Sequence, residues 1–535
     1  MTNDDENRSA AEQQRTQSRR HFLQGTLGAA LASAGIYEII NTLAQPPQRV
    51  AFADGQPRPP EDSVANGQPR PPEQYIIENL QIIMDNGSGI NSSDGTIPIV
   101  VPPLHTHVIT AKLNVPAHTK AFLQEAQHYL ESVLLDLEQK FAPPPTGLDI
   151  VVVWGLPYFQ HYIPSLGTTS SFFRAGTRYP DYLPVDLATS KLEGRTVYAV
   201  QEAMTFPSDQ PPAGFGPVRL EQNDVAVLLR SDSLENIMAG TNAIFGTESN
   251  QAGSLFNVTS IRRGFSGGAF YGQQGLASKL ALAANLPGAE SIPIHAQLFL
   301  GFTTTLQANL APGVIANLEA IPGVTDQWPN GYFQRGTTMH LSHLFEDLAT
   351  WYASGGPPNF STYADRLRAM FQPGLSIAEG TLTANPPIES EANVFQDVQH
   401  YQTYGHSGSM QTITRQATPT TDNYGNVYPT GTPVSTRGDF NTMDNPFHYT
   451  SDPTGDRYSD QPAAGMHFII FQPTIGNFNR TRLAMDGHYS DGKIIDLAPR
   501  SFGAGFNSVL YTTHRQNYLV PPRSHRSFPL AEFLA

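Results

Sequence analysis

The chain has 535 residues, a formal net charge of -15 and no cysteine. The missing cysteines exclude disulfides, thiolate nucleophiles, cysteine-ligated zinc, iron-sulfur clusters and covalent Cys-x-x-Cys-His haem attachment. The acidic balance, with no long basic run beyond the N-terminus, argues against nucleic acid as a partner. Histidine, carboxylate and tyrosine chemistry remain.

The N-terminal segment resembles a twin-arginine export leader. Arg19 and Arg20 stand just ahead of a small, uncharged stretch at 24–34, which is the order of charge and apolar core that such leaders have. We assign residues 1–53 to this leader, with candidate cleavage sites after Ala34 and Ala53. The apolar core is too short to cross a bilayer, so we expect no stable membrane span. The segment predicts export to the periplasm or the cell exterior.

A proline-rich linker follows at 54–74. The heptapeptide Gly-Gln-Pro-Arg-Pro-Pro-Glu occurs twice, at 55–61 and again at 67–73. Such a sequence cannot build a core and favours an extended conformation. We expect it to be a spacer, with folded structure beginning near Tyr75.

Residues 75–295 have the pattern of an α+β domain. Apolar side chains step by three or four along 119–141, which predicts a helix, and short β-branched runs at 148–154 and 224–230 predict buried strands. Further strands are predicted at 108–115 and 253–259, with a second helix from Asp232 to Phe245. The order β-α-β-β-α-β is that of a ferredoxin-like unit.

Residues 296–535 fit a second α+β unit of the same kind. Strands are predicted at 297–302, 338–345 and 465–472, and helices from Thr350 onward and at 362–371. The segment 418–436 is rich in Thr, Gly, Pro and Asn and predicts a long exposed loop.

Two local patterns suggest other kinds of site. Ser266, within Gly264-Phe-Ser-Gly-Gly268, matches the Gly-x-Ser-x-Gly elbow of serine hydrolases, although no Asp or His partner is evident. Two histidine pairs suggest metal binding: His105 with His107, and His340 with His343. In a strand, residues three apart point to opposite faces, so the second pair is a poor chelate and core positions are favoured.

Four segments of the C-terminal half, taken in order, resemble the dye-decolorising peroxidase (DyP-type) superfamily. They are 297–302, 404–407, 435–438 and 467–472, with the sequences Gln-Leu-Phe-Leu-Gly-Phe, Tyr-Gly-His-Ser, Ser-Thr-Arg-Gly and His-Phe-Ile-Ile-Phe-Gln. The resemblance is remote and covers about residues 75 to 530. It implies two ferredoxin-like units packed as a DyP-type fold, with the haem pocket in the C-terminal unit.

The resemblance also implies roles for individual residues. His406 matches the proximal ligand of non-covalent haem b, and Arg437 matches the distal arginine. Gly301 and Phe302 match the start of the family's Gly-Phe-x-Asp-Gly segment, and Phe471 lies in the matching apolar strand. The family's aspartate falls on Thr304, so the group that moves a proton between peroxide oxygens is missing. A threonine hydroxyl is not a useful proton acceptor near neutral pH.

The sequence therefore predicts an exported haem protein that uses hydrogen peroxide and an unidentified reducing substrate, with weak or altered turnover. Two alternatives stay open: a non-catalytic binding or scaffold protein that kept the fold without haem, and a serine hydrolase that uses Ser266. The sequence also leaves homo-oligomerisation open.

Overall fold

The computed structural model describes most of the chain from Arg70 onward. The described residues are 70–75, 81–84, 91–92, 97–100, 102–115, 119–143, 147–163, 182–210, 216–248, 251–266, 274–294, 296–301, 313–353, 381–382, 390–402, 415–445, 462–496, 505 and 507–534. The predicted leader, the helix expected at 362–371, and Phe302, Thr304 and His406 lie outside them.

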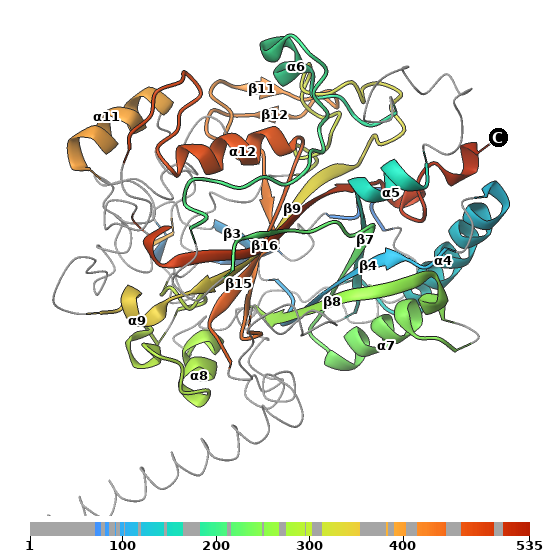
Figure 1. Cartoon of the computed structure of the whole chain (residues 1–535), viewed down its shortest axis with the longest axis horizontal. Coiled ribbons are helices and arrows are strands. Elements are labelled where there is room, and N and C mark those ends of the chain that lie inside the picture. The colour runs from blue at the N-terminus through green and yellow to red at the C-terminus, as the bar shows by residue number, and fades with distance from the viewer. Residues whose placement is uncertain are drawn as a thin grey trace, which may run out of the picture.

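A closed, antiparallel barrel forms the centre of the molecule (Figure 1). Around the ring, each strand pairs with the next and the last pairs with the first. The order is β8 (Phe256–Phe265), β4 (His105–Leu113), β7 (Val225–Ser231), β5 (Asp149–Gly155), β16 (Leu510–Val520), β9 (Thr337–Glu346), β15 (Gly465–Gln472) and β14 (Phe440–Thr442). Two short strands, β13 (Thr436–Arg437) and β6 (Arg219–Leu220), extend the sheet beside β15 and β16.

Each half of the chain contributes four neighbouring strands to the ring, in the orders β8-β4-β7-β5 and β14-β15-β9-β16. The α+β class is therefore confirmed. The two halves do not form separate sheets, because β16 pairs with β5 and β14 pairs with β8. The boundary at residue 295 remains a prediction.

Helices pack on the outside of the barrel (Figure 1). The α-helices are α4 (Lys120–Lys140), α5 (Leu156–His161), α6 (Leu187–Glu193), α7 (Leu234–Phe245), α8 (Leu276–Ala283), α9 (Leu348–Trp351), α11 (Glu391–Tyr401) and α12 (Ile475–Ala484). Short 3-10 helices are η4 (Ala252–Leu255), η6 (Ala289–Ser291), η11 (Arg523–His525) and η12 (Ala531–Phe533). Figure 1 shows α11 and α12 near one another, away from α4 and α7.

Local sequence explains the two longest helices of the N-terminal half. Thr119 caps α4 by accepting a hydrogen bond from the Phe122 amide, and Ser233 caps α7 in the same way. Both helices bury one apolar stripe against the barrel. The predicted helices are confirmed, but the second begins after Ser233 and not at Asp232.

Strand alternation divides the barrel into an inner and an outer face. The middle of the inner face is apolar and buried; it includes Val108, Leu228, Leu341, Ile469 and Phe471. The intervening residues face the helices and form the outer cores. Burial on both faces explains why these strands have long apolar runs.

Three expectations are corrected. Residues 297–301 form bends and a turn, with the Gly301 amide bonded to the Leu298 carbonyl at 3.0 Å, and not a strand. The strand expected at 253–259 starts only at Phe256, after η4.

The third correction concerns 418–436, which is not simply an exposed loop. It contains a small hairpin of β11 (Thr420–Thr421) and β12 (Val427–Tyr428), and Tyr428 and Val434 are buried with the inner apolar core.

Minor strands β1 (Gln81–Met84) and β3 (Ile97–Val100) pair with each other, as do β2 (Asn91–Ser92) and β10 (Thr381–Leu382). Among the described helices, none is both long and apolar enough to cross a membrane.

Candidate functional site

The outer face of the C-terminal strands carries Arg437. In the antiparallel pair of β13 and β15, Arg437 is opposite Ile470 and Thr436 is opposite Phe471. Paired residues project to the same side, so the Arg437 side chain lies on the outer face with Ile470. Its side chain is 24 % exposed, and its Nε lies 3.4 Å from an oxygen of Asp439. Among the described residues, Asp439 is the only ion-pair partner of this guanidinium.

The turn that ends at Gly301 is held against the same outer face. Asn441 lies in β14, opposite Met466 of β15. Its side-chain amide donates a hydrogen bond of 2.9 Å to the Gln297 carbonyl. Trp351 donates to the Leu300 carbonyl at 2.8 Å. Gly301 has a φ of 82°, in the left-handed region that glycine adopts without strain. The turn that ends at Gly301 is therefore anchored to β14.

The turn that ends at Gly301 is thus anchored on the face that carries Arg437. Asn441 lies four positions beyond Arg437, so the Gln297 anchor and the guanidinium are separated by roughly 13 Å of strand. Two segments of the resemblance whose matched residues are 136 positions apart in the sequence are therefore linked to one face of the sheet.

Helix α11 leads to the predicted ligand His406 and packs near this face. Its Val394 and Val398 are buried with Ala484 at the end of α12 and with Tyr489. Helix α12 in turn packs on the outer face, where Phe478 lies with Ile470. The helix ends at Tyr401, five residues before His406.

Phe471 is not brought to this region. Its ring is fully buried on the inner face and stacks on Tyr75, with ring centroids 5.5 Å apart. Phe471 and Arg437 therefore project to opposite sides of one sheet. Phe468 and Ile470, which alternate with Ile469 and Phe471 on this strand, share the face with Arg437.

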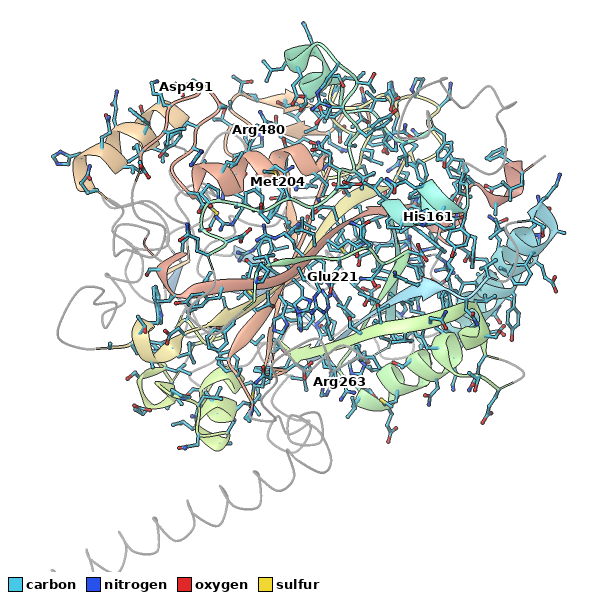
Figure 2. The ribbon with its side chains drawn as sticks, in the orientation of Figure 1. His161, Met204, Glu221, Arg263, Arg480 and Asp491 are labelled. Atoms are coloured by element: carbon cyan, nitrogen blue, oxygen red, sulfur yellow. The ribbon has the colours of Figure 1, made fainter. Side chains whose placement is uncertain are left out.

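A second polar region lies inside the barrel. We call it the lumen cluster and define it as His343, His467, His514, Arg262 and Glu221. The register places the three histidines opposite one another on β9, β15 and β16, all on the inner face. The rings of His343 and His467 have centroids 4.2 Å apart. Figure 2 shows Glu221 near the middle of the molecule.

An ion pair anchors the lumen cluster. Glu221 pairs with the Arg262 guanidinium and accepts a hydrogen bond from His514 Nδ1 at 3.1 Å. Burial alone would raise the pKa of Glu221, but Arg262 and His514 lower it to about 2. Burial lowers the pKa of all three histidines, and the charge of Arg262 adds to this effect. The three imidazoles are therefore neutral at physiological pH.

The alternative sites proposed from sequence receive little support. His340 and His343 do project to opposite faces, as expected: the His340 ring stacks on Phe478 outside, with centroids 3.7 Å apart. His105 and His107 share a face and are buried. Within the described ranges, no three His, Asp or Glu side chains are placed to hold a metal ion.

Ser266 follows the end of β8, where its amide donates to the Leu104 carbonyl at 3.0 Å. Among the residues described, its hydroxyl has no hydrogen bond to a histidine. The strand-turn-helix geometry of a hydrolase elbow extends into 267–273, which is outside those residues. The hydrolase remains an untested prediction.

Sequence reasoning missed one more titratable group, Glu346 at the end of β9. Burial raises its pKa to about 8. Neither of its carboxylate oxygens has a hydrogen-bond partner in the described part of the chain. It follows an apolar strand and precedes Asp347, the α9 cap, so nothing in the local pattern marks it as buried.

Comparison with known proteins gives a family without an assigned role. A family model described as "Family of unknown function (DUF7405)" matches residues 193–522. No curated protein matches the chain.

Among solved structures, a dye-decolorizing peroxidase from Bacteroides thetaiotaomicron is 9% identical, with a TM-score of 0.41, over 80% of this chain and 98% of that one. A dye-decolorizing protein from V. cholerae is 11% identical, with a TM-score of 0.40, over 80% and 96%. A DypB variant from Rhodococcus jostii RHA1 in complex with heme is 11% identical, with a TM-score of 0.41, over 81% and 96%.

Proposed function

This chain belongs to the DUF7405 family, whose function is unknown, and we propose that it is an exported haem-binding protein with weak peroxide-dependent oxidoreductase activity. The observation that carries the proposal is that the turn ending at Gly301 is anchored to Asn441, which lies on the same outer face as Arg437 and four positions further along the strand. Gly301 and Arg437 come from two separate segments of the resemblance, and α11, which leads to His406, packs beside the same face through α12.

The residues on this face fit the chemistry of haem. A porphyrin offers two apolar faces and two anionic propionates. Phe206, Phe468, Ile470 and Phe478 form an apolar cluster there, and Arg437 supplies a cation beside it. In this proposal His406 would hold the iron through a neutral imidazole nitrogen. The haem would be bound non-covalently, because a chain without cysteine cannot form the Cys-x-x-Cys-His link.

Bound haem would supply an iron centre that reacts with peroxide. Arg437 is always protonated, so its Nη groups can donate hydrogen bonds to a peroxide oxygen that gains negative charge. Thr304 can orient peroxide through its hydroxyl but cannot accept its proton. General acid-base help is worth about 10² to 10⁴ in rate, so its loss predicts slow turnover.

The proposal is tested by loading the full chain with haem and measuring peroxide-dependent dye oxidation. We expect haem uptake, slow turnover in the wild type, a gain of about tenfold or more in Thr304→Asp and a loss in Arg437→Ala. Arg480→Ala, on the exposed side of α12 (Figure 2), is the matched control. Absence of haem uptake would reject the function, and an unchanged rate in both variants would reject the site.

The scaffold alternative is favoured by one observation. Part of the outer face is already filled, because His340 stacks on Phe478 and Phe206 packs edge-on against the same ring. A protein that has lost its cofactor would fill the vacated face in this way. If the scaffold alternative holds, neither the wild type nor Thr304→Asp takes up haem.

Export by the twin-arginine route is part of the proposal. Replacing Arg19 and Arg20 together by Lys should leave the protein in the cytoplasmic fraction of its host, with the signal segment uncleaved. Normal export of that variant would contradict it.

A further inference from the structure

The second copy of the duplicated heptapeptide does not act as a free spacer; its last four residues are bound to the fold. We call residues 70–75 the docked arm. The Arg70 guanidinium donates to the carbonyls of Phe141 and Leu148, at 2.8 and 3.1 Å. Its Nε lies 4.0 Å from Glu138, and its side chain is only 11% exposed.

The two prolines are recognised through their backbone. Arg523 donates from its amide to the Pro72 carbonyl at 2.8 Å, and from Nε to the Pro71 carbonyl at 2.9 Å. Proline has no amide hydrogen, so an extended Pro-Pro segment offers only carbonyls, and an arginine fork suits them. Recognition of extended proline-rich segments commonly uses their preformed backbone in this way.

Glu73 completes the set at the other end. It is buried, pairs with Arg335 Nη1 at 3.0 Å, and accepts a hydrogen bond from Asn317 Nδ2 at 3.1 Å. A buried carboxylate with both a cation and an amide donor is a specific contact, because an apolar residue would leave these donors without their acceptor. The fold therefore makes specific contacts with an arginine, two prolines and a glutamate in that order.

The first copy carries the same four groups. Arg58, Pro59, Pro60 and Glu61 repeat the sequence of 70–73, twelve positions earlier. We propose that the groove bounded by Glu138, Arg335 and Arg523 is a binding site for the sequence Arg-Pro-Pro-Glu, and that residues 58–61 of this chain are its second occupant. The N-terminal arm can then dock in two registers.

The residues that follow each copy decide which register is preferred. Gln74 exchanges hydrogen bonds with the backbone of Val152, and Tyr75 is buried against Phe471. After the first copy, Asp62 and Ser63 stand at these positions and cannot replace the amide or the ring. The second copy is therefore the resting occupant, and the first takes over when the second leaves. Tethering gives the first copy a high effective concentration at the groove.

The test uses a fluorescent synthetic peptide, Gly-Gln-Pro-Arg-Pro-Pro-Glu, added to the full chain. The wild type should not bind it, since its own arm fills the groove. Arg70→Ala should bind it weakly, because residues 58–61 compete. The double variant Arg58→Ala with Arg70→Ala should bind at least threefold more tightly than Arg70→Ala, and Arg58→Ala alone should behave as wild type.

Equal affinity in the single Arg70→Ala variant and the double variant would show that the first copy is not an occupant. No binding by the double variant would show that the groove does not read this sequence. A matched series with Glu73→Gln and Glu61→Gln perturbs the other end of the motif more mildly, and covers the case in which the arginine variants fail to fold. Adding Arg523→Ala to the double variant should abolish binding.

Discussion

The charged side chains on the two faces of the C-terminal strands differ in their burial and in their pairing. On the inner face, Arg262 and Glu221 are sealed together with three neutral histidines. On the outer face, Arg437 is half-buried and, among the described residues, forms an ion pair only with Asp439, at 3.4 Å. A sealed, paired charge contributes to the fold, whereas an accessible one has donors for a ligand. The comparison supports a structural role for the lumen cluster, and it supports the proposal that a ligand binds on the outer face.

Breaking the lumen ion pair should have the largest effect. Glu221→Ala would leave the Arg262 charge buried without its carboxylate, which costs about 3 to 5 kcal/mol in comparable pairs. Urea unfolding followed by circular dichroism measures this. Glu248→Ala, an exposed residue, is the control. A loss as small as that of the control would mean that the inner face does not depend on this pair.

Acid should destabilise the protein through its buried histidines. Burial, with the nearby charge of Arg515, lowers the pKa of His340 to about 3, against 6.5 for the free side chain. The unfolded state therefore binds the proton first, so stability is present above pH 6.5 and is lost as the pH falls toward 3. Each such histidine contributes about 1.4 kcal/mol per pH unit. His340→Gln should flatten the slope by about this amount, and exposed His400→Gln should not. Identical slopes would refute the assignment.

Glu346 should act in the opposite direction and more weakly. Its raised pKa, about 8, means that the unfolded state releases the proton first, so stability is full below pH 4.5 and is lost as the pH rises toward 8. Glu346→Gln keeps the shape without the ionisation. It should raise the free energy of unfolding by about 1 to 3 kcal/mol at pH 7, with no gain below pH 4.5. A variant less stable than wild type at pH 7 would show that the carboxylate is paired.

The sequence was sufficient to predict the bounds of those elements whose apolar periodicity agrees with their burial in the fold. The strand at 465–472 has the predicted bounds, and α4 begins and ends within a residue of its prediction. The prediction failed where tertiary contacts decide the local conformation or the burial of a segment. The apolar run 297–301 forms turns because Asn441 and Trp351 bind its carbonyls. The polar segment 418–436 is partly buried because Tyr428 and Val434 enter the inner core.

The site shows the same division. Gly301 and Arg437 were predicted from their order along the chain; the turn that ends at Gly301 is anchored on the face that carries Arg437, and the role of both residues in the site stays a prediction. That order could not tell that Phe471 faces the other way, because assigning a face requires the register of β13 on β15. The lumen cluster was missed for a similar reason: His343, His467 and His514 become neighbours only through strand pairing.

The most direct test of the outer face as a haem site is an absorption titration of the full chain with haem. His406→Ala is compared with His400→Ala on α11, which is exposed and six positions away. We expect a saturable, one-to-one Soret shift in the wild type and in His400→Ala, and at least tenfold weaker binding in His406→Ala. Identical titrations for the two variants, or no shift in the wild type, would contradict the proposal.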